Sequence, residues 1–323
     1  MKKRIVVLLV ALALIVASLS AEAAVLPTAV ESIDLPLSTP HSTPVSVTYI
    51  PSFSRYYAAD AGTGYIARVW DATGTPIGTS AIGPLPASLY FNPNTSLLES
   101  VSLDACCTSG PTTGIQSLTL DGSGNYTGGN TQLLAGPISG LGSNSWTMPS
   151  YNPVANRLYA RQAGTADVNV VDRATGALIN TITLDLAAAG VTAGDVNADF
   201  VGFTGVTDEE LAIFDFTNRR VLIFNLTGGY VGGSTLPVGL TVDFYDVNFG
   251  NGYANGLFFI YDSAVGANGT YRGFQVLQNV PAAATPVPTM NEWGMIIFMM
   301  MAGLNSAYFL RRRRRIEGKR PIL

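Results

Sequence analysis

The sequence offers very little histidine or cysteine for chemistry. His41 is the single histidine in 323 residues, so histidine-based nucleophilic triads and multi-histidine metal sites are poorly supplied. The only cysteines are the adjacent pair Cys106 and Cys107. Helix signals are almost absent between Ala24 and Pro281. These shortages favour an all-β body with no catalytic residues and no metal ligands that the sequence singles out.

Positive charge is also scarce in the body of the chain. Between Ala24 and Glu292 there are 20 acidic residues and 8 basic ones, an excess of 12 negative charges, and every basic residue is arginine. Such a surface repels nucleic acid and anionic lipid, so neither is an expected partner of the body. Divalent cations are compatible with it, although charge alone does not place a site.

The N-terminus has the three parts of a secretory signal peptide. A basic start, Met1 to Arg4, precedes 15 apolar residues, Ile5 to Leu19, and Ala21-Glu22-Ala23 fits the small-x-small cleavage pattern. An uncleaved anchor is the alternative, but 15 residues are short for a membrane span. We therefore expect residues 1–23 to be removed by signal peptidase and the chain to be exported.

The body is self-similar. Each copy has an apolar strand, a polar turn, a second apolar strand, and an Asp or Asn shortly before a glycine that begins a third strand. The clearest copies begin at Arg55, Arg157 and Glu210, with a weaker copy ending at Gly124 and a fifth from Leu257 to Leu277. The expected turn glycines are Gly74, Gly122, Gly176 and Gly228, separated by 48, 54 and 52 residues.

A period near 50 residues with about four strands is typical of a β-propeller blade. The segment Leu211 to Asn225 resembles the NHL and YVTN propeller repeats, a resemblance that implies a propeller. We predict an all-β body, residues 24–280, with about five four-stranded blades, in which Ile33 to Leu37 supplies a strand that closes the ring with the last blade. A β-sandwich or a solenoid with recurring hairpins is the alternative.

The C-terminus has the layout of a membrane anchor. A Pro-rich linker, residues 281–292, precedes the uncharged segment Trp293 to Leu310, which as a helix would span roughly 27 Å. A basic tail, residues 311–323, follows and begins with five arginines, Arg311, Arg312, Arg313, Arg314 and Arg315. Arginine beside a membrane helix stays on the cytoplasmic side, so the body is expected to face outward.

The residues around the start of this segment add a second feature. The run consists of Pro288, Thr289, Met290, Glu292, Trp293 and Gly294. Together with the apolar segment and the arginines, it resembles the IPTL-type C-terminal sorting signal of Gram-negative bacteria. That resemblance implies processing by an exosortase, a membrane-embedded cysteine protease, and delivery to the cell surface or the medium. Met290 stands where the family usually has Leu, and the chain continues past the arginines to Leu323. An ordinary single-pass anchor remains the alternative.

Three shorter patterns lead to local predictions. Cys106 and Cys107 are predicted either to form a strained vicinal disulfide, to stay as free thiols, or to cross-link to another chain. Asp195, Asn197 and Asp199 have the alternating oxygen ligands of a calcium loop, but Phe200 stands where that loop needs Gly and Val206 where it needs Glu. Asp208-Glu209-Glu210 is expected to form an exposed acidic turn, because adjacent buried carboxylates would repel one another.

These observations favour an exported, non-enzymatic propeller that binds an unidentified ligand at the cell surface or in the extracellular matrix, with no required cofactor. The main alternative is a secreted propeller-type hydrolase or lactonase whose carboxylates hold a divalent metal at the central opening. A purely structural surface component is a third possibility.

Overall fold

The computed structural model describes residues 25–39, 46–60, 66–82, 85–103, 112–141, 148–162, 164–196, 200–240 and 252–278. The chain divides into two compact units, Met1–Pro281 and Ala282–Leu323, and every described residue lies in the first. The expected signal peptide, sorting motif, membrane helix and basic tail lie outside the described residues. Within the described ranges, no helix has the length and apolarity needed to cross a bilayer.

The described part of the chain is all-β, as predicted, with twenty strands and one short 3-10 turn, η1 (Ser139–Leu141). Three sheets have four strands each, in sequence order and antiparallel throughout. The first contains β2 (Thr48–Ile50), β3 (Arg55–Ala59), β4 (Ile66–Asp71) and β5 (Pro76–Ala81). The second contains β6 (Leu85–Asn92), β7 (Leu97–Leu103), β8 (Thr112–Leu120) and β9 (Tyr126–Ala135). The third contains β10 (Ser150–Asn152), β11 (Arg157–Arg161), β12 (Asp167–Asp172) and β13 (Leu178–Thr183).

The remaining eight strands form one sheet made of two four-stranded sets. One set is β14 (Gly202–Phe203), β15 (Leu211–Asp215), β16 (Arg220–Phe224) and β17 (Tyr230–Thr235). The other is β18 (Gly252–Ala254), β19 (Leu257–Asp262), β20 (Thr270–Leu277) and the N-terminal strand β1 (Val25–Pro36). The two sets meet where β1 pairs with β17 in parallel, with Thr28 opposite Thr235.

The N-terminal strand therefore completes the last set of strands. From Val30 onward β1 runs antiparallel to β20, with Ile33 opposite Gly273 and Leu35 opposite Tyr271. The prediction that Ile33 to Leu37 closes the ring beside the last strands is confirmed for Ile33 to Pro36. Closure here joins residues from the two ends of the body.

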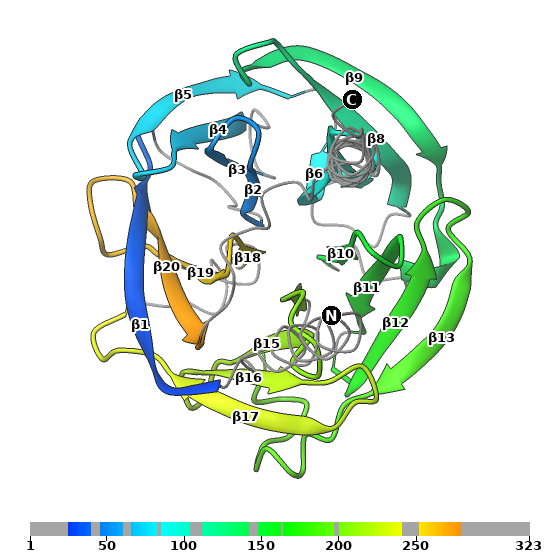
Figure 1. The fold of residues 1–323 in the computed structure, drawn as a ribbon, viewed down its shortest axis with the longest axis vertical. Helices are drawn as coiled ribbons and strands as arrows, with labels where there is room; N and C mark the ends of the chain where they lie inside the picture. Colours follow the sequence, from blue (N-terminus) through cyan, green and yellow to red (C-terminus); the bar gives the residue numbers. More distant parts are fainter. Residues whose placement is uncertain are drawn as a thin grey trace, which may run out of the picture. The chain divides into compact units, whose positions relative to one another are not determined.

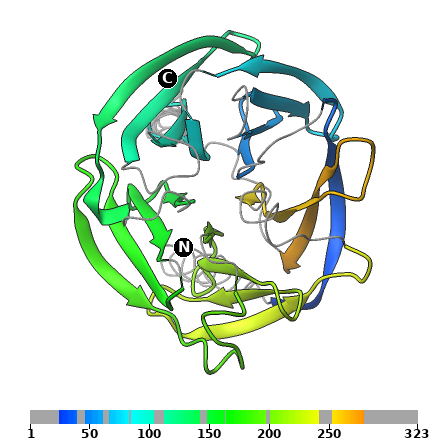
Figure 2. The ribbon, with the colours of Figure 1, turned by 180° about the vertical axis from the view of Figure 1, so that it is seen from behind.

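Figures 1 and 2 show the sheets following one another around a common centre, a β-propeller-like arrangement within the first unit. In Figure 1, β2, β6, β10 and β18 lie nearest the centre, and β5, β9, β13, β17 and β1 lie on the periphery. Side chains on the second and third strands are almost continuously buried, as in β15 and β16, whereas the outermost strand β5 is mostly exposed. Burial on both faces explains why the middle strands are unbroken apolar runs.

The turns into β5, β9, β13 and β17 follow one local pattern. Asp71 Oδ1 accepts hydrogen bonds from the N–H groups of Thr73 and Thr75 at 2.8 and 2.9 Å, and Asp121, Asp172 and Asn225 play the same part in their own sets. Hydrogen bonds from the turn lower the pKa of Asp71, Asp121 and Asp172. Each turn ends at a residue with positive φ. That residue is glycine, because this backbone conformation is strained for residues with a side chain.

The second of these turn glycines was predicted wrongly. The residue with positive φ is Gly124, at 79°, and not Gly122. The turn glycines are thus Gly74, Gly124, Gly176 and Gly228, at 50, 52 and 52 residues apart, so the repeat is more regular than the sequence alone indicated. The sequence Asp121-Gly-Ser-Gly124 has two glycines, and only the hydrogen bonds to Asp121 show which one closes the turn.

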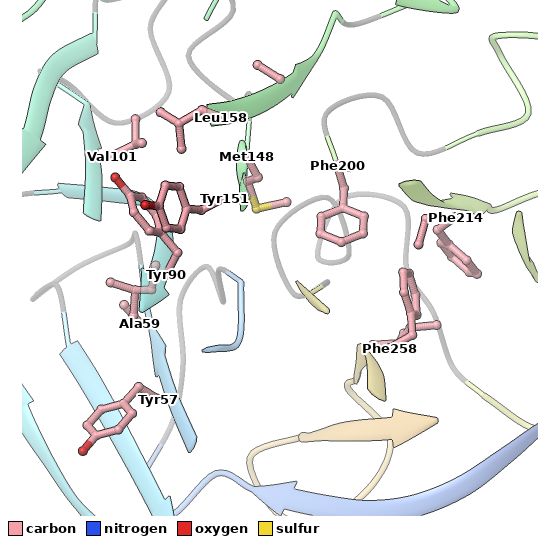
Figure 3. Close-up of a cluster of buried hydrophobic side chains, with 14 of the residues drawn as sticks. Tyr57, Ala59, Tyr90, Val101, Met148, Tyr151, Leu158, Phe200, Phe214 and Phe258 are labelled. Atoms are coloured by element: carbon pink, nitrogen blue, oxygen red, sulfur yellow. The ribbon is translucent and has the colours of Figure 1, made fainter. Parts of the chain in front are cut away.

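The largest core cluster has members from every sheet, including Tyr57, Tyr90, Leu158, Phe214 and Phe258 (Figure 3). Direct hydrogen bonds also link neighbouring sheets. Tyr57 donates to the carbonyl of Gly124 at 2.7 Å, and Asn255 Nδ2 donates to the hydroxyl of Tyr56 at 2.9 Å, which joins the last set of strands to the first. The sheets therefore share one continuous interior.

Candidate functional site

Buried pairs of a carboxylate with an arginine are the main polar feature of the described body. In three of the repeats, an Asp lies at the end of the apolar second strand and an arginine of the third strand reaches back to it. These pairs are Asp60 with Arg68, Asp215 with Arg220, and Asp262 with Arg272. All three Asp side chains are buried. Three of the five copies therefore share an ion pair as well as strands and turns.

In the first sheet the pair is completely enclosed. Arg68 Nε lies 3.1 Å from both carboxylate oxygens of Asp60, and Nη2 lies 2.5 Å from Oδ2. Arg68 Nη1 donates to the carbonyl and the hydroxyl of Thr39, at 3.1 and 3.0 Å. The guanidinium therefore joins β4 to the connection that leads from β1 to β2.

The two other pairs make similar links. Arg220 donates to Asp215 Oδ2 from Nε at 3.0 Å and from Nη2 at 2.7 Å, and Nη2 also reaches the carbonyl of Ala189. Arg272 donates from Nη1 to Asp262 at 3.0 Å and from its other nitrogens to Glu31 on β1, at 2.7 and 2.5 Å. Each arginine thus holds its own strand pair and a segment distant in the sequence.

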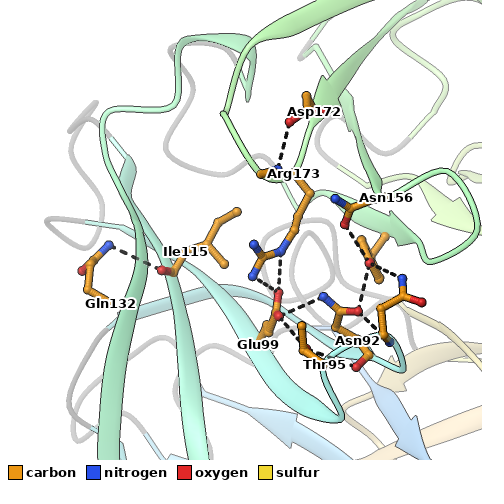
Figure 4. A network of polar contacts seen from close by, with 11 residues as sticks. Asn92, Thr95, Glu99, Ile115, Gln132, Asn156, Asp172 and Arg173 are labelled. Carbon is orange, nitrogen blue, oxygen red and sulfur yellow. Dashed lines mark hydrogen bonds and ion pairs between the residues drawn. The ribbon is translucent and has the colours of Figure 1, made fainter.

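A fourth pair, Glu99 with Arg173, joins the second and third sheets (Figure 4). Glu99 is fully buried in the middle of β7, and its Oε2 accepts from Arg173 Nε and Nη2 at 2.9 and 2.6 Å. Its other oxygen accepts from Asn92 Nδ2 at 3.0 Å and from the hydroxyl of Thr95 at 3.3 Å. Both carboxylate oxygens are therefore occupied by donors.

Aromatic residues cover this pair. Tyr90 and Tyr151 pack with ring centroids 4.8 Å apart, and the Tyr151 hydroxyl lies 3.0 Å from Asn92 Oδ1. Burial, together with the nearby negative charge of Glu99, raises the pKa of Tyr90 well above its ordinary value. Tyr90 consequently stays neutral across physiological pH.

The innermost strands are tied together by hydroxyl groups. Ser46 Oγ accepts from the N–H of Leu89 at 2.9 Å, Thr48 Oγ1 from the N–H of Phe91 at 3.2 Å, and Ser150 Oγ from the N–H of Phe203 at 2.7 Å. Met148 and Phe200 form a parallel bridge between the third and fourth sets, and both are buried (Figure 3). These contacts join the innermost strands of neighbouring sheets.

Most sites predicted from sequence lie outside the described residues. These are Cys106 and Cys107, His41, the sorting residues Pro288 to Gly294, and Arg311 to Arg315. The described ranges hold no group of three or more His, Cys, Asp and Glu side chains that could bind a metal ion.

The calcium pattern is only partly described, because Asn197 and Asp199 lie outside the described residues. The carboxylate of Asp195 is bound locally: its Oδ2 accepts from the hydroxyl and the N–H of Thr192, at 2.7 and 2.8 Å. These hydrogen bonds lower the pKa of Asp195. Asp195 therefore stays ionised and supports its own turn.

The prediction of an exposed acidic turn at Asp208-Glu209-Glu210 is confirmed only for Asp208, because Glu209 is buried and Glu210 is half-buried. Asp208 is exposed, with φ of 64°, but Glu209 is buried at 6% exposure. The hydroxyl of Thr204 donates to the carbonyl of Glu209 at 2.6 Å, and the N–H of Thr204 donates to the carbonyl of Glu210 at 2.8 Å. This loop folds back on itself, and burial, with Glu209 nearby, raises the pKa of Tyr253.

Sequence reasoning missed the ion pairs, although a signal was present. Asp60, Asp215 and Asp262 each end an apolar strand in equivalent copies of the repeat. Glu99 is a lone charge within the apolar strand β7. An acid that recurs at a buried strand end requires a cation, and in this body every available cation is an arginine.

Comparisons with known proteins add little to this picture. No family model and no curated protein matches the chain. Among solved structures, the crystal structure of Myxococcus xanthus glutaminyl cyclase is similar over 79% of this chain and 97% of that chain, with 13% sequence identity and a TM-score of 0.48. Values this low carry no argument about activity, so the function has to be argued from the residues described above.

Proposed function

We propose that the body is a five-bladed β-propeller that acts as a non-enzymatic binding or structural protein at the cell surface or in the extracellular matrix. The five blades are the three four-stranded sheets and the two four-stranded sets of the eight-stranded sheet. The parallel pair between β1 and β17 joins the strands of the last two blades, and Phe214 packs against Phe258 between them. A ring closed by residues from both ends of the body suits a protein that persists outside the cell.

The observation that carries the non-enzymatic assignment is that four buried acids are paired with arginine. Asp60, Glu99, Asp215 and Asp262 are each buried and bound by an arginine. A carboxylate held in this way is enclosed and its oxygens are already bound by donors, so little of it is left to bind a substrate or a metal ion. These four buried carboxylates are better suited to joining strands than to performing chemistry.

Export and sorting form the second half of the proposal. The chain would cross the inner membrane with the help of residues 1–23, stay anchored by residues 293–310, and then be cleaved near Thr289 by an exosortase-type protease. The presence of Pro288, Thr289, Glu292, Trp293 and Gly294 supports this, because a simple anchor needs only apolar length and a basic stop. A Pro-stiffened extended segment enters a protease active site at little entropic cost.

Mass spectrometry of both mature termini, in each cell fraction, tests the sorting proposal. We expect an N-terminus at Ala24 and a C-terminus close to Thr289 in the surface or medium fraction. Replacing Pro288 and Thr289 with Ala should leave the full-length tail in the inner membrane. Wild-type protein from whole cells that still carries Arg311 to Leu323 would show that the tail is only an anchor.

The non-enzymatic assignment has its own test. The exported protein should show no hydrolysis of lactone or ester probes, with or without added calcium. Hydrolysis that a chelator abolishes and calcium restores would overturn the assignment in favour of a propeller-type hydrolase or lactonase. As a control, the same preparation should first show β structure with little helix by circular dichroism.

A further inference from the structure

The peripheral strands of four blades contain no charged residue. These strands are β5, β9, β13 and β17, and their side chains are mainly Thr, Ser, Gly, Asn and small apolar residues. The contrast with the rest of the body is sharp, because the segment from Ala24 to Glu292 has 20 acidic residues and 8 arginines. On these four blades the outer rim is therefore uncharged, whereas β1 on the fifth blade carries Glu31 and Asp34.

Three of these strands end their sheets. Among the described residues, β5, β9 and β13 each have a hydrogen-bonded neighbour on one side only. In β9 six consecutive residues, from Thr127 to Gln132, are exposed. Soluble proteins usually protect such edges with lysine, proline or inward-pointing charges. In β9 there is no charge and no proline, so the remaining protection is an irregular register at two places, between Tyr126 and Asn130 and between Gln132 and Leu134.

Exposed apolar side chains recur at one place on the rim. An irregularity in register follows the turn in β5, β13 and β17, and the extra residue is Ile77, Ile179 or Val231. Their exposures are 42%, 44% and 42%. Equivalent positions in three blades therefore present a β-branched side chain to solvent, beside an uncharged strand.

The protein itself shows that such a rim accepts another strand. The first residues of β1 lie along the outer edge of β17, where Thr28 pairs in parallel with Thr235. In Figure 1 the two strands meet at the periphery. A Cβ built on Gly232 of β17 would approach the side chain of Val25 to 3.1 Å, so the added strand is in close contact. The other three uncharged rims have no such cover among the described residues.

We propose that the outer edge of β9 binds a second copy of this chain, with the two β9 strands adding edge to edge in an antiparallel pair. Two copies of a body with 12 excess negative charges repel one another except where charge is absent, and β9 is such a place. An antiparallel pair of identical strands is self-complementary, as a two-fold dimer requires. At ten residues β9 is also longer than β5, β13 and β17, which have six each.

Charge substitution at Thr131, an exposed residue of β9, tests the proposal. Thr131→Lys and Thr131→Glu each place like charges near one another in a two-fold strand pair, which is destabilising. The full chain, produced in a Gram-negative host and extracted in mild detergent, is examined by sedimentation over a range of concentrations. We expect wild-type protein to self-associate, each variant alone to associate about tenfold more weakly or worse, and an equal mixture of the two variants to recover association.

Whether Thr131→Lys weakens or strengthens self-association distinguishes edge pairing of β9 from general charge repulsion. If association is governed only by the net negative charge, Thr131→Lys strengthens it, and the proposal fails. Ala72→Lys, at an exposed turn position of the first blade, is the matched control for net charge and should not weaken association. Monomeric wild-type protein, or a mixture of Lys and Glu variants that fails to recover association, would also overturn the proposal. The assay does not depend on tail processing, so its outcome is independent of the sorting test.

Discussion

Glu99 shows how a single residue can hold two blades together. It lies in β7, and its carboxylate is bound by Arg173 from the turn of the next blade and by Asn92 and Thr95 from its own blade. A buried ion pair is costly to assemble, but losing one partner is worse, because the remaining charge stays buried without compensation. The cost of removing Glu99 should therefore exceed the cost of removing both partners.

Glu99→Gln is expected to lower the free energy of unfolding by about 3 kcal/mol, because it leaves the Arg173 guanidinium without its counter-charge. The double change Glu99→Gln with Arg173→Met should cost less than the single change. Denaturant unfolding of the mature protein measures both. Asp121→Asn, in an exposed turn, is the control for loss of a carboxylate in general. A double variant less stable than Glu99→Gln would contradict the argument.

A turn glycine is the other residue on which blade packing depends. Gly228 has φ of 87°, and a Cβ built there would lie 2.1 Å from the carbonyl oxygen of Thr183 on the preceding blade. Gly74 has the same geometry against the carbonyl oxygen of Asp34. The glycine is needed at this place for its backbone conformation and for the close approach of the neighbouring strand.

Gly228→Ala is expected to lower the free energy of unfolding by about 3 kcal/mol, whereas Gly164→Ala should lower it by about 1 kcal/mol. Gly164 also has positive φ, at 69°, but a Cβ there meets no atom within 4 Å, so only the backbone strain is felt. The difference between the two variants, measured by denaturant unfolding, isolates the contact between blades. If both variants lose the same free energy of unfolding, the strand beside Gly228 moves aside without cost, and the contact argument is wrong.

At the scale of elements, β1 decides whether the ring is closed. Arg272 of β20 binds Glu31 of β1 and Asp262 of β19, and Asp34 lies 3.9 Å away. The hydrogen bonds from Arg272 lower the pKa of Glu31, whereas burial, with Glu31 nearby, raises the pKa of Asp34. A fall in pH therefore has opposite effects on the two contributions to stability: it removes the contribution of Glu31 and relieves the unfavourable contribution of ionised Asp34.

The stability contributed by Glu31 should be lost in acid. Its folded pKa lies below the ordinary value of 4.5, so the contribution is complete above that value and disappears as the pH falls through the lowered pKa. Asp34 has a raised pKa and offsets part of this loss, because the folded state takes up its proton more readily. Denaturant midpoints from about pH 3 to about pH 7 should fall less steeply in acid for Glu31→Gln than for wild type. A steeper fall in the variant would contradict this reading.

At the scale of the whole body, half of the arginines form ion pairs with buried acids. Four of the 8, namely Arg68, Arg173, Arg220 and Arg272, are bound to buried acids. These four pairs do not reduce the excess of 12 negative charges between Ala24 and Glu292, and exposed like charges repel one another. Buried pairs are poorly screened by salt, and exposed repulsion is strongly screened.

Raising the ionic strength from about 0.01 M to about 0.15 M should therefore increase the urea midpoint of the mature protein. The physical reason is that salt weakens the surface repulsion and leaves the enclosed ion pairs nearly unchanged. A sulfate salt would confuse the result by strengthening hydrophobic burial, so sodium chloride is the appropriate choice. A midpoint that falls with added salt would mean that exposed ion pairs outweigh the repulsion.

Much of the fold could be predicted from short stretches of sequence. The apolar runs at Leu211 to Phe214 and Val221 to Phe224 indicate buried strands, and Asp71-Ala-Thr-Gly74 indicates the tight turn that follows them. These features work because side-chain patterning and turn hydrogen bonds act within a few residues. The choice between Gly122 and Gly124 failed for the same reason, since both fit the local pattern.

The sequence by itself determined the strands, the turns, the approximate period and the scarcity of positive charge, because each depends on neighbouring residues or on composition alone. Only the tertiary structure decided which acids are buried and which cation meets them. Glu99 and Arg173 are 74 positions apart, and Glu31 and Arg272 are 241 apart. No local pattern encodes such a pairing, because a charge is buried only when the folded ring brings its partner within hydrogen-bond distance.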